Sequence, residues 1–169
     1  MSQLIDDLLA WSRLERAEMR AAPLNVRELI DALLAECAGE VKTRAVAVSI
    51  AVPFASIDAD RGMLVLALRN LLENALKYTR RVAHPQIEFG GREDGVSCVL
   101  WVRDNGAGFE TQYRERIFEV FQRLHRAEDY PGTGVGLAIV RKAMQRMGGR
   151  AWAESAPGKG AAFYLELPK

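Results

Sequence analysis

The amino-acid sequence predicts an α+β fold, a two-layer sandwich of helices on a sheet. The first observation is a hydrophobic content of 49% over 169 residues, which is enough for a substantial core. The second is that strand patterns follow one another without an intervening helix, over residues 87–103 and again over residues 150–167. Consecutive strands beside separate helices are typical of α+β folds and argue against a doubly wound parallel sheet. At this length the chain can form one domain and a short appendage.

The individual elements follow from hydrophobic periodicity and from helix and turn signals. Asn25 and Glu28 match a capping box, which marks the start of a helix. The segment from Ala21 to Pro23 breaks the helix pattern that precedes it. In chain order the predicted elements are a helix at residues 2–19, a helix from Asn25 to near Gly39 or shortly after, strands at 45–52 and 55–57, a helix from Asp58 or Asp60 to about Tyr78, strands at 87–90 and 96–103, a helix or helical turns at 110–121, a mobile loop at 123–131, a helix at 135–147, and strands at 150–155 and 161–167.

The first predicted helix carries an apolar stripe that needs a partner. Leu4, Leu8 and Trp11 repeat at helical spacing on one face. Two interpretations stay open: the helix folds back on its own domain, or it is the end of a longer helical hairpin or dimer stem. We favour the second interpretation, which divides the chain into a stem segment at residues 1–22 and a main domain at residues 23–169.

The long helix that ends near Tyr78 carries a polar ridge. Asn70, Asn74, Lys77 and Tyr78 lie close together, because side chains separated by whole turns share one face of a helix. Asparagine is a poor helix former. By themselves the two asparagines could be solvated residues on a surface helix, and it is the glycine segments downstream that favour a functional surface.

Two glycine-rich segments follow this helix. The segment Asp104-Asn-Gly-Ala-Gly108 comes directly after an apolar strand pattern, and the segment Gly132-Thr-Gly-Val-Gly-Leu137 opens an apolar helix pattern. An acid beside glycines can bond a flat heterocycle while the backbone comes close. Glycines at a helix start leave backbone N–H groups free to hold phosphate. The ridge and the two segments together predict a nucleotide site, although neither a P-loop nor a dinucleotide fingerprint is present.

Composition excludes several other classes. A formal net charge of +1 gives no case for nucleic acid as a partner. No apolar run approaches the roughly 18 residues of a membrane helix, and the N-terminus lacks a basic n-region, so we expect no membrane contact and no signal peptide. Cys37 and Cys98 lie in apolar contexts and are expected to be reduced core residues. These features favour a cytoplasmic protein.

Four segments in this order resemble the conserved boxes of the sensor histidine kinases. The resemblance includes the N box at residues 70–79, the G1 box at 104–108, the F box at 117–121 and the G2 box at 132–137. The runs at residues 121–125 and 151–155 are most similar to the phytochrome-type and sensory-domain-type branches of the family. The resemblance implies the Bergerat ATP-binding fold for the main domain, with ATP and Mg²⁺ as ligands.

The resemblance also implies a role for each matching residue. Asn74 would bind Mg²⁺ with Asn70 in support, and Lys77 would approach the phosphates. Arg123, and with it Arg126, would reach the γ-phosphate. The implied catalytic residues are thus Asn74, Lys77 and Arg123.

The adenine end and the glycine loop complete the implied site. Tyr78 would lie against the base or ribose, and Asp104 would accept a hydrogen bond from the adenine amine. Phe118 and Phe121 would anchor the polar loop at residues 123–131, which would act as a lid over the site, or they would pack in the core. The implied nucleotide-binding residues are Asn70, Asn74, Lys77, Tyr78, Asp104, Gly106, Gly108, Gly132, Thr133, Gly134, Val135, Gly136 and Leu137.

The acceptor histidine of this family lies on the first helix of a dimeric stem and is followed by an acid. His84 precedes a proline, and His125 lies in a polar loop, so neither is assigned as the acceptor. Residues 2–19 resemble the end of the second stem helix. The resemblance therefore implies a catalytic domain that phosphorylates a histidine on a stem absent from the chain, in a homodimeric kinase that serves a response regulator receiver domain.

Two other functions stay open. Related ATPases of the gyrase, Hsp90 and mismatch-repair types use a glutamate base four positions before the metal-binding asparagine, and Asn70 occupies that position here. Hydrolysis should therefore be slow. The alternatives are a Ser/Thr kinase or hydrolytic ATPase of the same fold, and a regulatory module that binds nucleotide or a partner without catalysis.

Overall fold

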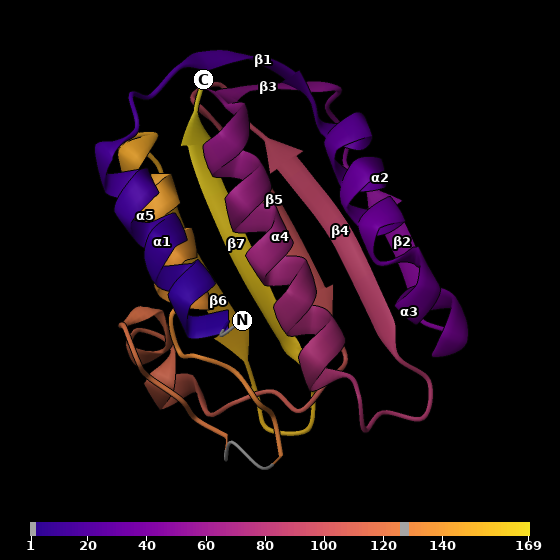
Figure 1. The fold of residues 1–169 in the computed structure, drawn as a ribbon. Coiled ribbons are helices and arrows are strands. Elements are labelled where there is room, and N and C mark those ends of the chain that lie inside the picture. Colours follow the sequence, from indigo (N-terminus) through magenta and orange to yellow (C-terminus); the bar gives the residue numbers. More distant parts are fainter. Residues whose placement is uncertain (1–2, 126–128) are drawn as a thin grey trace.

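The computed structural model describes residues 3–125 and 129–169, which form a sheet covered on one face by helices (Figure 1). This arrangement confirms the predicted α+β class. The elements are α1 (Gln3–Arg16), β1 (Ala21–Asn25), α2 (Val26–Glu36), α3 (Ala38–Thr43), β2 (Ala47–Ala51), β3 (Ser56–Asp60), α4 (Arg61–Tyr78), β4 (Gln86–Glu93), β5 (Ser97–Asp104), two 3₁₀ turns (Thr111–Tyr113 and Arg116–Phe118), α5 (Gly136–Arg146), β6 (Arg150–Ser155) and β7 (Ala161–Pro168).

The main sheet has five strands in the order β2-β4-β5-β7-β6. β2 runs parallel to β4, and the other three pairs are antiparallel. β1 and β3 form a separate antiparallel pair. The β5–β7 pairing places the end of β5, at Asp104, opposite Ala161. The glycine segment that follows Asp104 therefore emerges from the middle of the sheet.

Helix α4 lies across the sheet and forms the centre of the core (Figure 1). Asp60 begins the helix, because its carboxylate accepts a hydrogen bond from the Met63 N–H at 3.0 Å. The residues of α4 that face the core are Met63, Leu64, Ala67, Leu68, Leu71, Leu72, Ala75 and Leu76. They pack against the inner side of the sheet at Ile87, Phe89, Leu100, Val102, Phe163 and Leu165. The polar ridge of α4 is left on a different face.

The opposite face of the sheet has its own aromatic cover. Trp152 stacks on Tyr164 at a centroid distance of 5.1 Å, and Trp101 lies 5.9 Å from the same ring. The Trp101 ring occupies the space above Gly90, where an added Cβ would come within 2.2 Å of it. These side chains shield the central strands without a second layer of helices.

Helix α1 folds back onto α5. Leu14 is buried, and the Arg146 guanidinium donates hydrogen bonds to the carbonyls of Leu14, Glu15 and Ala17 at 2.7, 3.0 and 2.6 Å. The first half of α1 is less covered, since four apolar side chains there, Leu4, Ile5, Leu8 and Leu9, are 37–48% exposed. The structure thus shows the folded-back arrangement, and a continuation of this helix into a longer stem stays a prediction.

The structure differs from the predicted elements in three places. β1 was not predicted, because its partner β3 lies far away in sequence and Pro23 is unusual in a strand; the two-stranded sheet tolerates it at an edge. The predicted single helix, ending near Gly39 or shortly after, is interrupted at Cys37, so that α2 ends at Glu36 and α3 begins at Ala38. Phe118 is buried, whereas Phe121 is 59% exposed and does not pack in the core.

No helix in the described ranges combines the length and the apolarity that crossing a membrane requires.

Candidate functional site

A cavity of about 460 Å³ lies where the C-terminal half of α4 meets the loops after β5 and before α5. It brings together most of the residues that the sequence singled out, although they are spread over three separate segments. The predicted residues that line it are Asn70, Asn74, Lys77, Tyr78, Asp104, Gly108, Arg123, Gly132, Thr133, Gly134, Gly136 and Leu137. Arg126 lies outside the described residues.

Two predicted residues do not line the cavity. The Val135 side chain is buried in the core, 1% exposed, because it precedes the first turn of α5. Gly106 packs against the end of α4, where an added Cβ would come within 2.3 Å of the Tyr78 carbonyl oxygen. The neighbouring Ala107 N–H donates to that oxygen at 3.1 Å. Gly106 therefore permits the contact between the two segments instead of facing a ligand.

The two asparagines of the ridge are held differently. Asn70 donates its amide to the Leu66 carbonyl at 2.9 Å, which turns its side-chain oxygen toward Gly136. A Cβ at Gly136 would lie 3.0 Å from that oxygen, so this glycine lets α5 begin close to α4. Within the described residues the Asn74 amide makes no side-chain hydrogen bond and lines the cavity. Its oxygen is thus available to a ligand.

Asp104 is a buried carboxylate at the end of β5. It is 6% exposed and accepts a hydrogen bond from the Gly106 N–H at 2.8 Å. Burial raises its pKa to about 6, against the opposing effect of backbone hydrogen bonds from Gly106 and Ala161. Within the described residues, no cationic side chain offsets the effect of burial on the pKa of this carboxylate. A group that donates a hydrogen bond from a ligand would therefore stabilise the charged form.

The other end of the cavity holds three cations, Lys77, Arg80 and Arg123, together with the carboxylates of Asp7 and Glu73. Burial lowers the pKa of Lys77, and the nearby charges of Arg123 and Arg80 act in the same direction. Gly132 lies beside the ammonium, since an added Cβ would be 2.8 Å from Lys77 Nζ. Arg123 donates to the Tyr130 carbonyl at 2.7 Å. Crowded positive charge of this kind favours an anionic ligand.

Tyr78 lies between the two ends. The pKa of its hydroxyl is raised, chiefly by burial, while the charge of Arg123 lowers it and that of Asp104 raises it. Its ring contacts the rings of His125 and Tyr130, with centroid distances of 5.2 and 5.1 Å. These two residues belong to the predicted loop at 123–131 and were not assigned to the site. The loop is thus tied to α4 by aromatic contacts that no local pattern indicates.

The N-terminal helix also reaches the cavity, which the sequence did not reveal. Gln3 and Asp7 line it, and the Thr133 hydroxyl donates to the Asp7 carboxylate at 2.5 Å. The same hydroxyl oxygen accepts from the Val135 N–H at 3.3 Å. The contact joins residues 126 positions apart. It follows from the docking of α1 on α5, so only the folded chain could show it.

The metal and cysteine predictions can be compared with the structure. In the ranges 3–125 and 129–169, no three His, Cys, Asp or Glu side chains gather as a metal cluster. Cys37 and Cys98 are free thiols, half-buried and buried respectively, and burial raises the pKa of both.

Comparison with known proteins shows the family of this chain. The family of histidine kinase-, DNA gyrase B- and HSP90-like ATPases matches residues 59–169. The methanogenesis regulatory histidine kinase FilI of Methanothrix harundinacea is 37% identical over 168 residues, which cover 99% of this chain and 19% of that protein. The phytochrome-like protein Cph1 of Synechocystis is 33% identical over 168 residues, which cover 99% of this chain and 22% of that protein. The chain thus spans about a fifth of the length of these relatives.

Solved structures of histidine kinases show the same fold. Full-length ShkA in complex with AMPPNP superposes with a TM-score of 0.83 at 30% identity, covering 98% of this chain and 35% of that one. The nucleotide-free catalytic domain of the histidine kinase ThkA superposes with a TM-score of 0.77 at 25% identity, covering 89% of this chain and 99% of that one.

These matches confirm the family that the four sequence boxes indicated. The chain belongs to the family of histidine kinase-, DNA gyrase B- and HSP90-like ATPases, and it is an ATP-binding catalytic domain of the sensor histidine kinase type.

Proposed function

We propose that the chain binds ATP with Mg²⁺ in this cavity and transfers the γ-phosphate to a histidine on a helical stem. The observation that carries the proposal is the polarity of the cavity. A buried carboxylate, Asp104, lies at one end, and the cations Lys77, Arg80 and Arg123 lie at the other. An adenine nucleotide has the complementary order, with a hydrogen-bond donor on its base and negative charge on its phosphates.

At the base end, Asp104 accepts a hydrogen bond from the exocyclic amine of adenine. Guanine has a carbonyl at that position, so it would leave the buried carboxylate without a donor. Tyr78 lies against the base or ribose. Gly108 also lines the cavity and has a φ of 66°, with no room for a Cβ because Ala156 O would be 2.2 Å away.

At the phosphate end, Lys77 and Arg123 bind the phosphate oxygens and stabilise the charge that builds during transfer. Backbone N–H groups around Gly132, Gly134 and Gly136 contribute further donors. Asn74 holds Mg²⁺ through its free amide oxygen, with Asn70 fixed one turn earlier. One protein ligand is reasonable, because Mg²⁺ takes most of its oxygens from phosphates and water.

The acids Glu40 and Glu73 line the cavity, but neither occupies the sequence position of the glutamate base of the hydrolytic relatives, four residues before the metal-binding asparagine. Asn70 stands at that position and its amide is bonded to Leu66, so it cannot accept a proton from water. Transfer to a partner is therefore favoured over hydrolysis. The proposed partners are the histidine-bearing stem of a homodimeric kinase and, after it, a response regulator receiver domain. Use of ATP as donor makes the cytoplasm the proposed compartment.

The first prediction concerns nucleotide selectivity. Mg²⁺–ADP at about 100 times its dissociation constant should stabilise the chain by roughly 2.7 kcal/mol, which corresponds to a rise in Tm of about 5–10 °C. Mg²⁺–GDP should give no rise, because it cannot donate to Asp104. Thermal unfolding with each nucleotide measures this. An equal rise with both nucleotides would remove the adenine assignment.

The second prediction concerns the acceptor. Incubated alone with labelled ATP, the chain should acquire no phosphohistidine, since His84 and His125 are not assigned as acceptors. Adding a purified stem fragment of a related kinase should produce label on the stem that is lost in acid. Acid-stable label would point to a Ser/Thr kinase, and no transfer despite ADP binding would favour a binding module.

The third prediction concerns the cost of the buried Asp104 charge. The carboxyl has a pKa of about 6, against an ordinary value of 3.8. The protonated Asp104 carboxyl therefore makes its full contribution to the free energy of unfolding below pH 4. This contribution is lost as the pH rises through 6, and ionisation lowers the free energy of unfolding by up to about 3 kcal/mol. Asp104→Asn removes the charge, but the asparagine accepts a hydrogen bond from one backbone N–H fewer. We therefore expect the free energy of unfolding to increase by about 1–2 kcal/mol at pH 7.5.

Denaturant unfolding of Asp104→Asn and of the parent chain, both without nucleotide, at pH 7.5 and pH 4 measures that increase in stability. The gain should disappear at pH 4, where the parent carboxyl is protonated, so the variant should then be no more stable than the parent chain. The same variant should lose the Tm rise with Mg²⁺–ADP. A variant that is less stable than the parent at pH 7.5 would contradict the prediction.

The fourth prediction concerns Asp7. Its carboxylate lies at the phosphate end and should repel the nucleotide. Asp7→Asn keeps an acceptor for the Thr133 hydroxyl and removes the charge, so the affinity for Mg²⁺–ADP should increase several-fold at low ionic strength. Titration calorimetry at two salt concentrations measures this, and the gain should shrink at high salt. Affinity unaffected at low salt would show that Asp7 does not act through its charge.

A further inference from the structure

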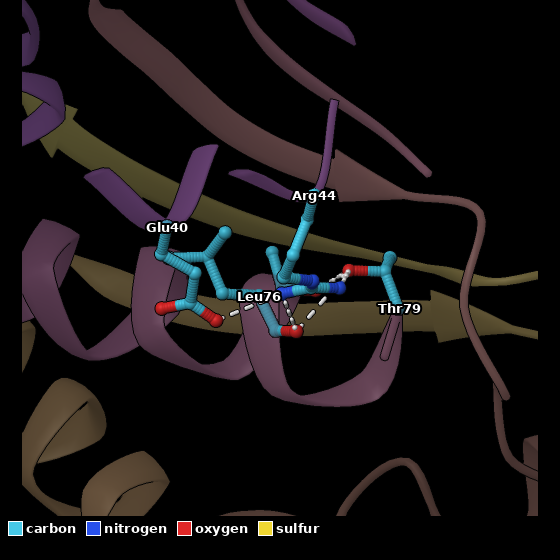
Figure 2. Close-up of polar contacts among 5 residues, drawn as sticks. Glu40, Arg44, Leu76 and Thr79 are labelled. Atoms are coloured by element: carbon cyan, nitrogen blue, oxygen red, sulfur yellow. Dashed lines mark hydrogen bonds and ion pairs between the residues drawn. The ribbon is translucent and has the colours of Figure 1, made fainter. Parts of the chain in front are cut away.

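We propose that Arg44 is a positioning residue for the nucleotide-binding end of α4. Arg44 follows α3 in the chain and is not among the residues that line the cavity. Its side chain instead reaches the last turn of α4, the turn that carries Lys77 and Tyr78 (Figure 2). The inference rests on the proposed nucleotide site and assigns a role to a residue outside it.

The guanidinium of Arg44 bridges three groups at the end of α4. It donates to the Leu76 carbonyl at 2.8 Å, to the Thr79 hydroxyl at 3.1 Å and to the Glu40 carboxylate at 2.9 Å (Figure 2). Only 20% of the Arg44 side chain is exposed. The positive charge complements the negative end of the helix macrodipole.

These contacts satisfy groups that the helix cannot satisfy itself. The last carbonyls of a helix have no intrahelical N–H partner. In the described part of the chain, no backbone N–H outside α4 donates to the Leu76 carbonyl. This carbonyl instead accepts hydrogen bonds from the Arg44 guanidinium and the Thr79 hydroxyl. Thr79 is fully buried, and its hydroxyl also contacts the Ala75 carbonyl at 2.7 Å. Removing Arg44 would leave buried polar groups short of a donor.

Arg44 is itself held in place by a strained turn. Ala45 has a φ of 52°, a left-handed conformation that alanine rarely adopts. The Val46 N–H donates back to the Val41 carbonyl at 2.9 Å, which closes the end of α3. The ion pair with Glu40 adds a second support. The guanidinium is thus presented to α4 from a fixed backbone.

The end of α4 is also tied to the loop that carries Asp104. The Tyr78 carbonyl accepts from the Ala107 N–H at 3.1 Å, and Gly106 packs against that carbonyl. A shift of the last turn would therefore move Lys77, Tyr78 and the Asp104 loop together. Because small displacements of binding groups are costly, Arg44 controls ligand affinity without touching the ligand.

The test compares Arg44→Gln with Arg69→Gln. Arg69 is also an arginine at α4 and makes a two-pronged contact with Glu36, at 2.9 and 3.1 Å, but it does not line the cavity or reach the helix end. Titration calorimetry with Mg²⁺–ADP, well below each Tm, should show affinity weakened about tenfold in Arg44→Gln. The affinity of Arg69→Gln should be unchanged.

Two further readouts separate positioning from general stability. Hydrogen exchange of the Ala107 amide in the empty chain should accelerate in Arg44→Gln and not in Arg69→Gln. This measurement needs no nucleotide, so it stays informative if the proposed function fails. A lower Tm for Arg44→Gln, with unchanged ADP affinity and unchanged Ala107 exchange, would overturn the proposal.

Milder variants cover the case in which Arg44→Gln does not fold. Thr79→Val removes one partner of the guanidinium at nearly constant volume and should weaken ADP binding in the same direction. Arg44→Lys keeps the charge but cannot bridge Leu76 and Thr79 together, so its affinity should be intermediate. In the double variant of Arg44→Lys and Thr79→Val the losses should not add, because both act on one contact. Fully additive losses would contradict the shared role.

Discussion

Helix α4 must present an apolar face to the sheet and a polar ridge to the nucleotide cavity, and the rest of the structure depends on how it meets both demands. Leu64, Leu68 and Leu71 are almost fully buried against the sheet. Asn70 and Asn74 project beside them into the cavity. Rotation of α4 by a fraction of a turn would expose the core and bury the ridge, so core packing fixes the orientation of the site.

The charges of the site lie in an environment that opposes them. Burial raises the pKa of Asp104 to about 6 and lowers the pKa of Lys77, so each group is pushed toward its neutral form. The empty domain bears these costs because the two groups lie at opposite ends of one cavity and do not pair. A nucleotide brings a donor to one end and negative charge to the other. The ligand thus supplies the interactions that the fold leaves unmade.

The sequence predicted the fold class and most of the site, because both are encoded in local patterns. The period of α4 placed the ridge on one face, and the two glycine segments identified the loops that meet it. Gly106 and Val135 were assigned to the ligand, but in the structure they do not line the cavity, and their contact with a nucleotide stays a prediction. Gly106 makes room for the Tyr78 carbonyl, and Val135 completes the core beneath the start of α5. A motif contains residues that shape a loop as well as residues that contact a ligand.

Other features had no local signal. β1 exists because it pairs with β3, and Asp7 reaches Thr133 only because Arg146 holds α1 on α5. His125 and Tyr130 join the site through their rings, which contact Tyr78. The sequence by itself determined the helix and strand periods, the ridge and the glycine segments, since these depend on neighbours along the chain. Only the tertiary structure decided which distant side chains close the cavity, because those contacts depend on how whole elements pack in space.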